Sequence, residues 1–289
     1  MPSRRDFVKQ SSLFTAGLLV GPADFFKEKK SIGVQLYTLR NEISKDAKGT
    51  IEKVAGLGYK EVETFGYRDG KFFGMPASEF AQFLKSVGLT SPSGHYFGGG
   101  FFFEDKWQEK WLSLLNDAKA IGQKYVVIPS LDAENRKTAD TFKVFAQKMN
   151  QAGEMAKSAG LQLAYHNHDF EFKDLGGQTG MNVLLKETDP KLVEMELDIY
   201  WAVKAGYNPI DLFKASPGRY SLWHVKDMDK TERKYFTEVG NGAINFKSIF
   251  AQAKLSGMKH FFVEQDVCPG PPLESIAKSF SYINKNLAK

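Results

Sequence analysis

Eight short apolar runs recur along the chain after about residue 30, and a longer segment of mixed polarity follows each of them. Successive runs begin roughly thirty residues apart, the length of one strand, one helix and their connections. The runs cover residues 32–37, 61–65, 89–95, 125–129, 161–167, 193–198, 220–225 and 260–265. Strands that alternate with helices pair in parallel, and eight of them close into a barrel. The spacing therefore predicts an α/β protein with a single (β/α)8 TIM barrel over residues 31–289.

The segments between the runs have apolar residues at every third or fourth position, which is the period of an amphipathic helix. We expect helices over residues 46–57, 76–87, 107–121, 142–159, 246–255 and 273–287. Glycine adopts the left-handed conformation that ends a helix, and it follows five of these segments. The five glycines are Gly58, Gly88, Gly122, Gly160 and Gly257.

An open, doubly wound parallel sheet is the alternative fold. A dinucleotide-binding sheet of that kind has the pattern G-x-G-x-x-G directly after its first strand, whereas this chain has Tyr-Thr-Leu-Arg at residues 37–40. The three glycines at residues 98–100 precede three phenylalanines and no P-loop lysine. We interpret this segment as a flexible, apolar loop of an active site.

The first 30 residues have the pattern of an export signal. Arg4 and Arg5 precede an uncharged, mildly apolar stretch at residues 11–20, which is too short to span a bilayer. The paired arginines resemble a twin-arginine signal, so we expect a periplasmic protein without a stable membrane span. A basic amphipathic helix is the alternative for this segment.

The net charge of +5 does not by itself indicate a nucleic-acid partner. Lysine and arginine are interspersed with aspartate and glutamate, and no long basic run interrupts the pattern. We expect a small-molecule substrate and no nucleic acid.

Histidine and acidic residues gather where the apolar runs end. They are His95 after the third run, His166, His168 and Glu171 at the fifth, Asp198 at the sixth, His224 at the seventh, and Glu264 and Asp266 at the eighth. The ends of barrel strands meet at one mouth, where active sites lie. So many ionisable groups in one place require a cation or a titrating role. Imidazole and carboxylate together suit manganese, zinc, magnesium or iron.

Three motifs resemble the xylose isomerase-like sugar phosphate isomerase/epimerase family. They are Glu-Leu-Asp at residues 196–198, Trp-His-Val-Lys-Asp at 223–227 and Phe-Val-Glu at 262–264, and the likeness extends from residue 32 to the C-terminus. The resemblance implies a divalent metal held by Asp198, His224 and Glu264. It also implies a fourth ligand after the fifth strand, where many relatives have Glu-Asn-His and this chain has His-Asn-His at 166–168. The fourth ligand is then His166, which we prefer, or Glu171.

Two departures from the family pattern argue against a simple 3-epimerase. The epimerases of this family use two metal-bound glutamates as acid and base, and one of them is replaced here by His166. They also have a histidine three residues after the aspartate ligand, where this chain has Trp201.

The chemistry that suits a metal beside His and Glu is removal of a proton next to a carbonyl group, through an enediolate. Glu264 or His168 is the expected base. His95 or Lys226 is expected to assist the oxygen that gains or loses charge. The residues expected to bind substrate are Tyr37, Glu63, Glu171 and Trp201. Glu63 is equally consistent with a surface carboxylate.

We rank a sugar isomerase or epimerase first. A lyase or dehydratase that acts on keto sugars, inososes or 3-keto-glycosides follows closely, because the same enediolate serves both reactions. A metal-dependent DNA-repair endonuclease would need more ligands and a basic surface. A non-catalytic carbohydrate-binding barrel is the alternative of another class, since aromatic residues near the strand ends can stack on sugar rings.

Overall fold

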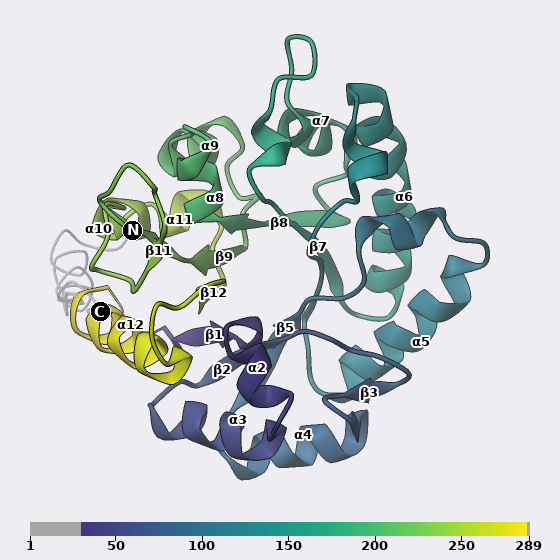
Figure 1. Ribbon diagram of the computed structural model, residues 1–289. Helices are drawn as coiled ribbons and strands as arrows, with labels where there is room; N and C mark the ends of the chain where they lie inside the picture. Colours follow the sequence, from purple (N-terminus) through teal and green to yellow (C-terminus); the bar gives the residue numbers. More distant parts are fainter. Residues whose placement is uncertain (1–29, 288–289) are drawn as a thin grey trace, which may run out of the picture.

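The computed structural model describes residues 30–287, and a ring of eight parallel strands lies at its centre (Figure 1). The strands are β1 Gly33–Gln35, β2 Glu61–Thr64, β5 Thr90–Gly94, β6 Tyr125–Ile128, β7 Gln162–His166, β8 Val193–Asp198, β9 Leu222–Val225 and β12 His260–Val263. Each one falls within a predicted apolar run. The predicted TIM barrel is therefore confirmed.

The barrel closes between β5 and β6. The strands pair in the order β5-β2-β1-β12-β9-β8-β7-β6, and an isolated parallel bridge between His95 and Val127 joins the two ends. Tyr96 N donates to Val127 O at 2.9 Å across this seam. Pro92 lies within β5 and has no N–H to donate, so the ladder is sparse there.

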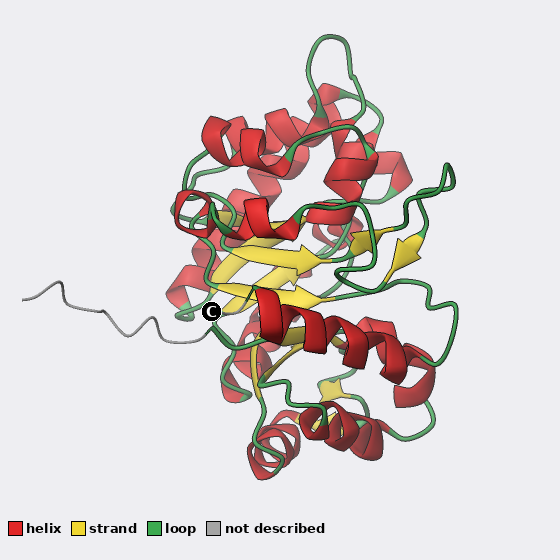
Figure 2. Ribbon diagram, turned by 90° about the vertical axis from the view of Figure 1, so that its left-hand side faces the viewer, coloured by secondary structure: helices red, strands yellow, loops and turns green. Residues whose placement is uncertain are grey.

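Helices surround the strands, as the view along the barrel and the view from its side both show (Figures 1 and 2). They are α2 Arg40–Ile43, α3 Ala47–Gly56, α4 Ala77–Ser86, α5 Trp107–Ala120, α6 Ala139–Ser158, α7 Gly180–Glu187, α8 Ile199–Lys204, α9 Pro209–Ala215, α10 Phe246–Phe250, α11 Ala253–Ser256 and α12 Pro272–Asn286. All five predicted terminal glycines have positive φ, between 72° and 104°. The predicted helix 246–255 is two short helices. Helix α6 begins earlier than expected because Thr138 Oγ1 accepts from Thr141 N and caps its N-terminus.

The barrel interior is filled in layers. Successive side chains of a strand point to opposite faces, so every second residue points into the barrel. Val127, Ala164, Leu222 and Phe262 form a small apolar cluster inside, separate from the main core. Two positions further along the chain come His166 at the end of β7, His224 in β9 and Glu264 directly after β12, which therefore reach the carboxyl end of the barrel.

The glycine-rich segment differs from expectation. Residues Gly99–Phe103 form a 3-10 helix, and Phe101 and Phe102 are buried in the core. The segment is therefore a short helix anchored by aromatic rings and not an irregular loop, whereas its flexibility stays a prediction.

The predicted signal lies outside the described residues and stays a prediction. Among residues 30–287, no helix combines the length and the apolar character needed to cross a bilayer.

Candidate metal centre and substrate cavity

Asp198, His224 and Glu264 come together at the carboxyl ends of β8, β9 and β12. These three strands are neighbours in the sheet, and Asp198 is in register with His224. All three side chains are buried, and His224 Nδ1 lies 2.7 Å from Glu264 Oε2. One ligand atom from each residue lies within 4.8 Å of the others. The structure thus brings three of the four predicted metal ligands into one group.

Local structure orients Asp198. It is the N-cap of α8, and its Oδ1 accepts from Trp201 N at 3.0 Å. Asn167, the residue after β7, accepts from Asp198 N through its Oδ1 at 3.0 Å. This hydrogen bond fixes the backbone of Asp198. Asp198 Oδ2 is left to face the site.

His166 is the fourth predicted ligand and lies at the edge of this group. Its Nε2 is 3.8 Å from Asp198 Oδ2, and its Nδ1 is 3.0 Å from Glu196 Oε2. A second, deeper set of potential ligands consists of His95, His166, Glu196 and His224. Glu196 was not singled out from the sequence as a site residue.

Glu63 is fully buried, so the surface carboxylate alternative is wrong. Its carboxylate accepts from Gln35 Nε2 at 2.8 Å and from Ser93 Oγ at 2.5 Å, and its Oε2 lies 2.6 Å from His224 Nε2. Burial by itself raises the pKa of Glu63, but the facing His95 and His224 outweigh it and lower the pKa to about 2. Glu63 is therefore an anion beneath His224.

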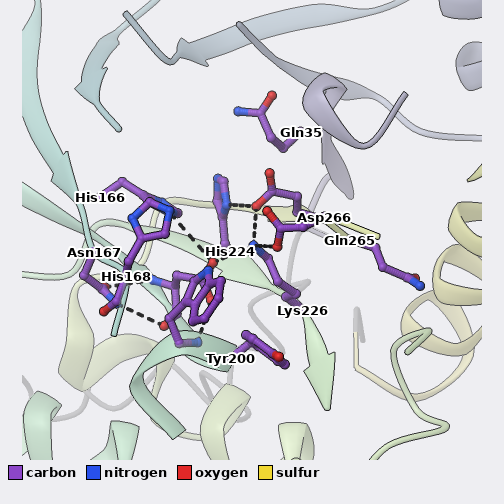
Figure 3. A network of polar contacts seen from close by, with 12 residues as sticks. Gln35, His166, Asn167, His168, Tyr200, His224, Lys226, Gln265 and Asp266 are labelled. Atoms are coloured by element: carbon purple, nitrogen blue, oxygen red, sulfur yellow. Dashed lines mark hydrogen bonds and ion pairs between the residues drawn. The ribbon is translucent and has the colours of Figure 1, made fainter. Parts of the chain in front are cut away.

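Lys226 lies among three carboxylates. Its Nζ is 2.9 Å from Asp198 Oδ2, 2.8 Å from Glu264 Oε2 and 2.6 Å from Asp266 Oδ2. Burial alone would lower the pKa of Lys226, but these carboxylates raise it well above its usual value. Figure 3 shows His224 between His166 on one side and Lys226 with Asp266 on the other. Lys226 is a permanent cation.

Glu171 lies behind His168. Its oxygens accept from Tyr165 Oη at 2.7 Å and from His168 N at 2.8 Å, and the side chain is fully buried. Burial raises the pKa of Glu171 to about 7. Both of its oxygens have protein partners, which favours His166 over Glu171 as the fourth ligand.

A cavity of about 460 Å³ opens above this network. It is lined by Tyr37, Phe65, Gly66, His95, Phe97, Gly98, Pro129, Ser130, His166, His168, Lys226, Glu264 and Asp266. The lining includes all four predicted acid and base groups and Tyr37. Glu63, Glu171 and Trp201 are not part of it, although the Trp201 ring lies 5.6 Å from that of His168.

The residues present fit a divalent cation. Asp198 Oδ2 is buried and receives no hydrogen bond from residues 30–287. Its charged contacts there are Lys226 Nζ at 2.9 Å and His166 Nε2 at 3.8 Å. The Lys226 ammonium already lies beside this oxygen, so the fit to a divalent ion rests on the chemistry of the donor set. Imidazole nitrogen and carboxylate oxygen are the donors that zinc, manganese and iron take, and magnesium favours the oxygens.

The chain belongs to the xylose isomerase-like TIM barrel family, whose model matches residues 51–286. It is 25% identical over 215 residues to an inosose dehydratase of Clostridium botulinum, an alignment that covers 63% of this chain and 71% of that enzyme. A second inosose dehydratase, from Geobacillus thermodenitrificans, is 26% identical and aligns over 54% of this chain and 58% of its own length.

Solved structures give a second comparison. A sugar phosphate isomerase/epimerase from Parabacteroides distasonis superimposes with a TM-score of 0.80 and 29% identity, covering 90% of this chain and 96% of the other. The IOLI protein, whose structure holds a zinc atom, has a TM-score of 0.69 at 15% identity, with 90% of this chain and all of the other covered. The second likeness shows the fold alone.

Proposed function

We propose that this protein is a metal-dependent lyase that eliminates a β-oxygen substituent from a small polyhydroxylated ketone. The observation behind the proposal is that one cavity, about 460 Å³ in volume, is lined by His95, His168, Lys226 and Glu264 above the candidate metal ligands. Proton abstraction next to a carbonyl needs a base, a stabiliser of the developing negative charge and an acid for the departing oxygen. These four residues supply such groups.

His168 is suited to be the base. Burial lowers its pKa to about 4, with Lys226 as the next cause, so the imidazole is neutral near pH 7. Glu171 fixes the backbone of His168 through the hydrogen bond from His168 N. Glu264, whose carboxylate is engaged by His224 and Lys226, is better suited to hold a metal than to accept a proton from carbon.

His95 and Lys226 are suited to assist the oxygens. Burial by itself lowers the pKa of His95, but the facing Glu63 and Glu196 outweigh burial and raise that pKa, which favours the protonated ring. Its ring lines the cavity together with that of His168. Two histidines whose surroundings move their pKa values apart form an acid and base pair.

The reaction balances with these groups. A proton leaves the carbon next to the carbonyl for His168, the bond from the β-carbon to its oxygen breaks, and that oxygen takes a proton from His95. A divalent ion, when bound, would polarise the carbonyl and stabilise the negative charge that forms on it. Lys226, which lines the same cavity with its Nζ 2.8 Å from Glu264 Oε2, adds a fixed positive charge.

A sugar isomerase or epimerase is the second candidate, because the 29% identical Parabacteroides neighbour is described as a sugar phosphate isomerase/epimerase. In that case the proton taken from one carbon returns to the same or the neighbouring carbon, and no bond to oxygen breaks. The first steps of the two reactions are the same.

The test uses metal-loaded protein with inososes, keto sugars and 3-keto-glycosides in deuterium oxide. Release of water or an alcohol, with the ultraviolet absorbance of the conjugated ketone, supports the lyase. Deuterium incorporation with an isomeric product and no released group supports the isomerase or epimerase. Saturable binding by fully metal-loaded protein with neither outcome contradicts both and supports a non-catalytic carbohydrate-binding protein.

A further inference from the structure

Two carboxylates lie beneath the candidate metal ligands and contact their histidines from below. We propose that Glu63 and Glu196 are positioning residues that fix the ring tautomers of His224 and His166, so that His224 Nδ1 and His166 Nε2 face the metal. This inference rests on the proposed function only in needing a bound divalent ion. It assigns a role to Glu196, and it gives Glu63 a different role from the predicted contact with substrate.

The two ring nitrogens of His166 face different carboxylates, Glu196 on one side and Asp198 on the other. Nδ1 lies 3.0 Å from Glu196 Oε2, the oxygen that His95 Nε2 and His224 Nε2 also face, so this oxygen is placed as the acceptor and the ring proton of His166 belongs on Nδ1. Nε2 then carries no proton and offers its lone pair, and it lies 3.8 Å from Asp198 Oδ2. Metal-binding histidines commonly donate their other ring N–H to a carboxylate in this way.

His224 has a carboxylate at each nitrogen. Nε2 lies 2.6 Å from Glu63 Oε2, and Nδ1 lies 2.7 Å from Glu264 Oε2. Glu63 is held rigidly by Gln35 and Ser93 and has no exposed surface, so it is a fixed acceptor for Nε2–H. Glu264 lines the cavity, and an ion bound between Glu264 and His224 would displace the proton from Nδ1.

The deeper set of His95, His166, Glu196 and His224 is the competing metal site. Its nitrogens nearest to Glu196 are His166 Nδ1 and His224 Nε2, the opposite atoms of both rings. A neutral imidazole offers a lone pair on one nitrogen only, so the two arrangements require different tautomers. The upper arrangement is favoured because Asp198 and Glu264 give it two carboxylates to balance a divalent cation, whereas Glu196 is the one carboxylate of the deeper set.

Zinc affinity and stoichiometry test the roles of the carboxylates. We expect Glu196→Gln and Glu63→Gln each to weaken zinc binding about 10- to 100-fold while one ion still binds at saturation. Glu194→Gln is the matched control, because Glu194 precedes Glu196 by two on β8 and so points to the same face, and it should bind zinc as the wild type does. Asp198→Asn should lose stoichiometric zinc. A thermal melt of each variant establishes that it is folded.

Ring tautomers are measured directly by nitrogen-15 NMR of histidine-labelled, zinc-loaded protein. We expect zinc on His166 Nε2 and His224 Nδ1, and a loss of the single tautomer at His166 in Glu196→Gln. Zinc on the opposite nitrogens, or full zinc binding by Asp198→Asn with none by Glu196→Gln, would overturn the proposal. So would unchanged affinity in both glutamine variants.

These results are separable from the proposed reaction. Protein with the expected tautomers but no turnover of any ketone would remove the lyase and leave the positioning roles intact. Turnover by a protein whose zinc lies on the opposite nitrogens would support the lyase and remove the positioning roles of Glu63 and Glu196.

Discussion

Glu171 has a buried carboxylate whose charge the fold disfavours, and this has a consequence for stability. Burial raises its pKa from 4.5 to about 7, so the folded protein holds the proton more tightly than the unfolded chain does. The resulting contribution to the free energy of unfolding is present below about pH 4.5 and is lost as the pH rises through 7.

Glu171→Gln should remove this loss of stability with rising pH. The amide can still accept from His168 N and donate to Tyr165 Oη, so the local contacts are kept. Relative to the wild type, we expect its free energy of unfolding to rise by about 2–3 kcal/mol between pH 5 and pH 8, from about 1.4 kcal/mol per pKa unit. Urea denaturation at a series of pH values measures the difference, and parallel curves for the two proteins would contradict it.

Some site residues were predictable from the sequence because they lie at strand ends. Asp198, His224 and Glu264 each end an apolar run, and the barrel brings such ends together. Glu196 was missed because an acidic residue inside a strand resembles one that faces solvent. Side chains two positions apart on a strand point to the same face, so Glu196 points into the barrel as Asp198 does. This alternation is the signal that identifies Glu196 as a site residue.

At the scale of elements, the glycines that end the helices permit a matched pair of substitutions. Gly122 follows α5 with φ of 87°, and Gly56 is the last residue of α3. Within the described part of the chain, an added Cβ would meet no atom within 4 Å at either position. The two sites therefore differ in backbone conformation and not in packing.

We expect Gly122→Ala to lower the free energy of unfolding by about 1–2 kcal/mol, because the left-handed conformation is strained for alanine. Gly56→Ala should raise it by roughly 0.5 kcal/mol, because alanine favours the helix. Urea denaturation of both variants checks the signs, and a stabilised Gly122→Ala protein would contradict the argument.

The strands of the barrel were more predictable than the short helices. All eight strands were expected, whereas the 3-10 helix Gly99–Phe103 was not. Glycine content suggested flexibility, but the burial of Phe101 and Phe102 depends on contacts with Trp107 and Trp111 of α5, which lie later in the chain. Periodicity within one segment does not reveal such contacts.

For the whole molecule, binding of a divalent ion should stabilise the fold. A ligand at 100 times its dissociation constant contributes about 2.7 kcal/mol, which corresponds to a rise in Tm of roughly 5–10 °C for a chain of this size. We expect this shift with zinc or manganese, its reversal with EDTA, and no shift in Asp198→Asn. Scanning calorimetry measures it, and an equal shift in the variant would place the stabilising ion elsewhere.

The candidate metal ligands and most of the remaining cavity wall come from different halves of the chain. The four candidate ligands lie at the carboxyl ends of β7, β8, β9 and β12, which are neighbours in the sheet and come from the second half of the chain. The opposite wall of the cavity, with Tyr37, Phe65, Phe97 and Ser130, comes from the first half. An exchange of the first half between related barrels would therefore replace most of the cavity wall together with Glu63, the partner of His224, while the four candidate ligands stayed on one continuous segment.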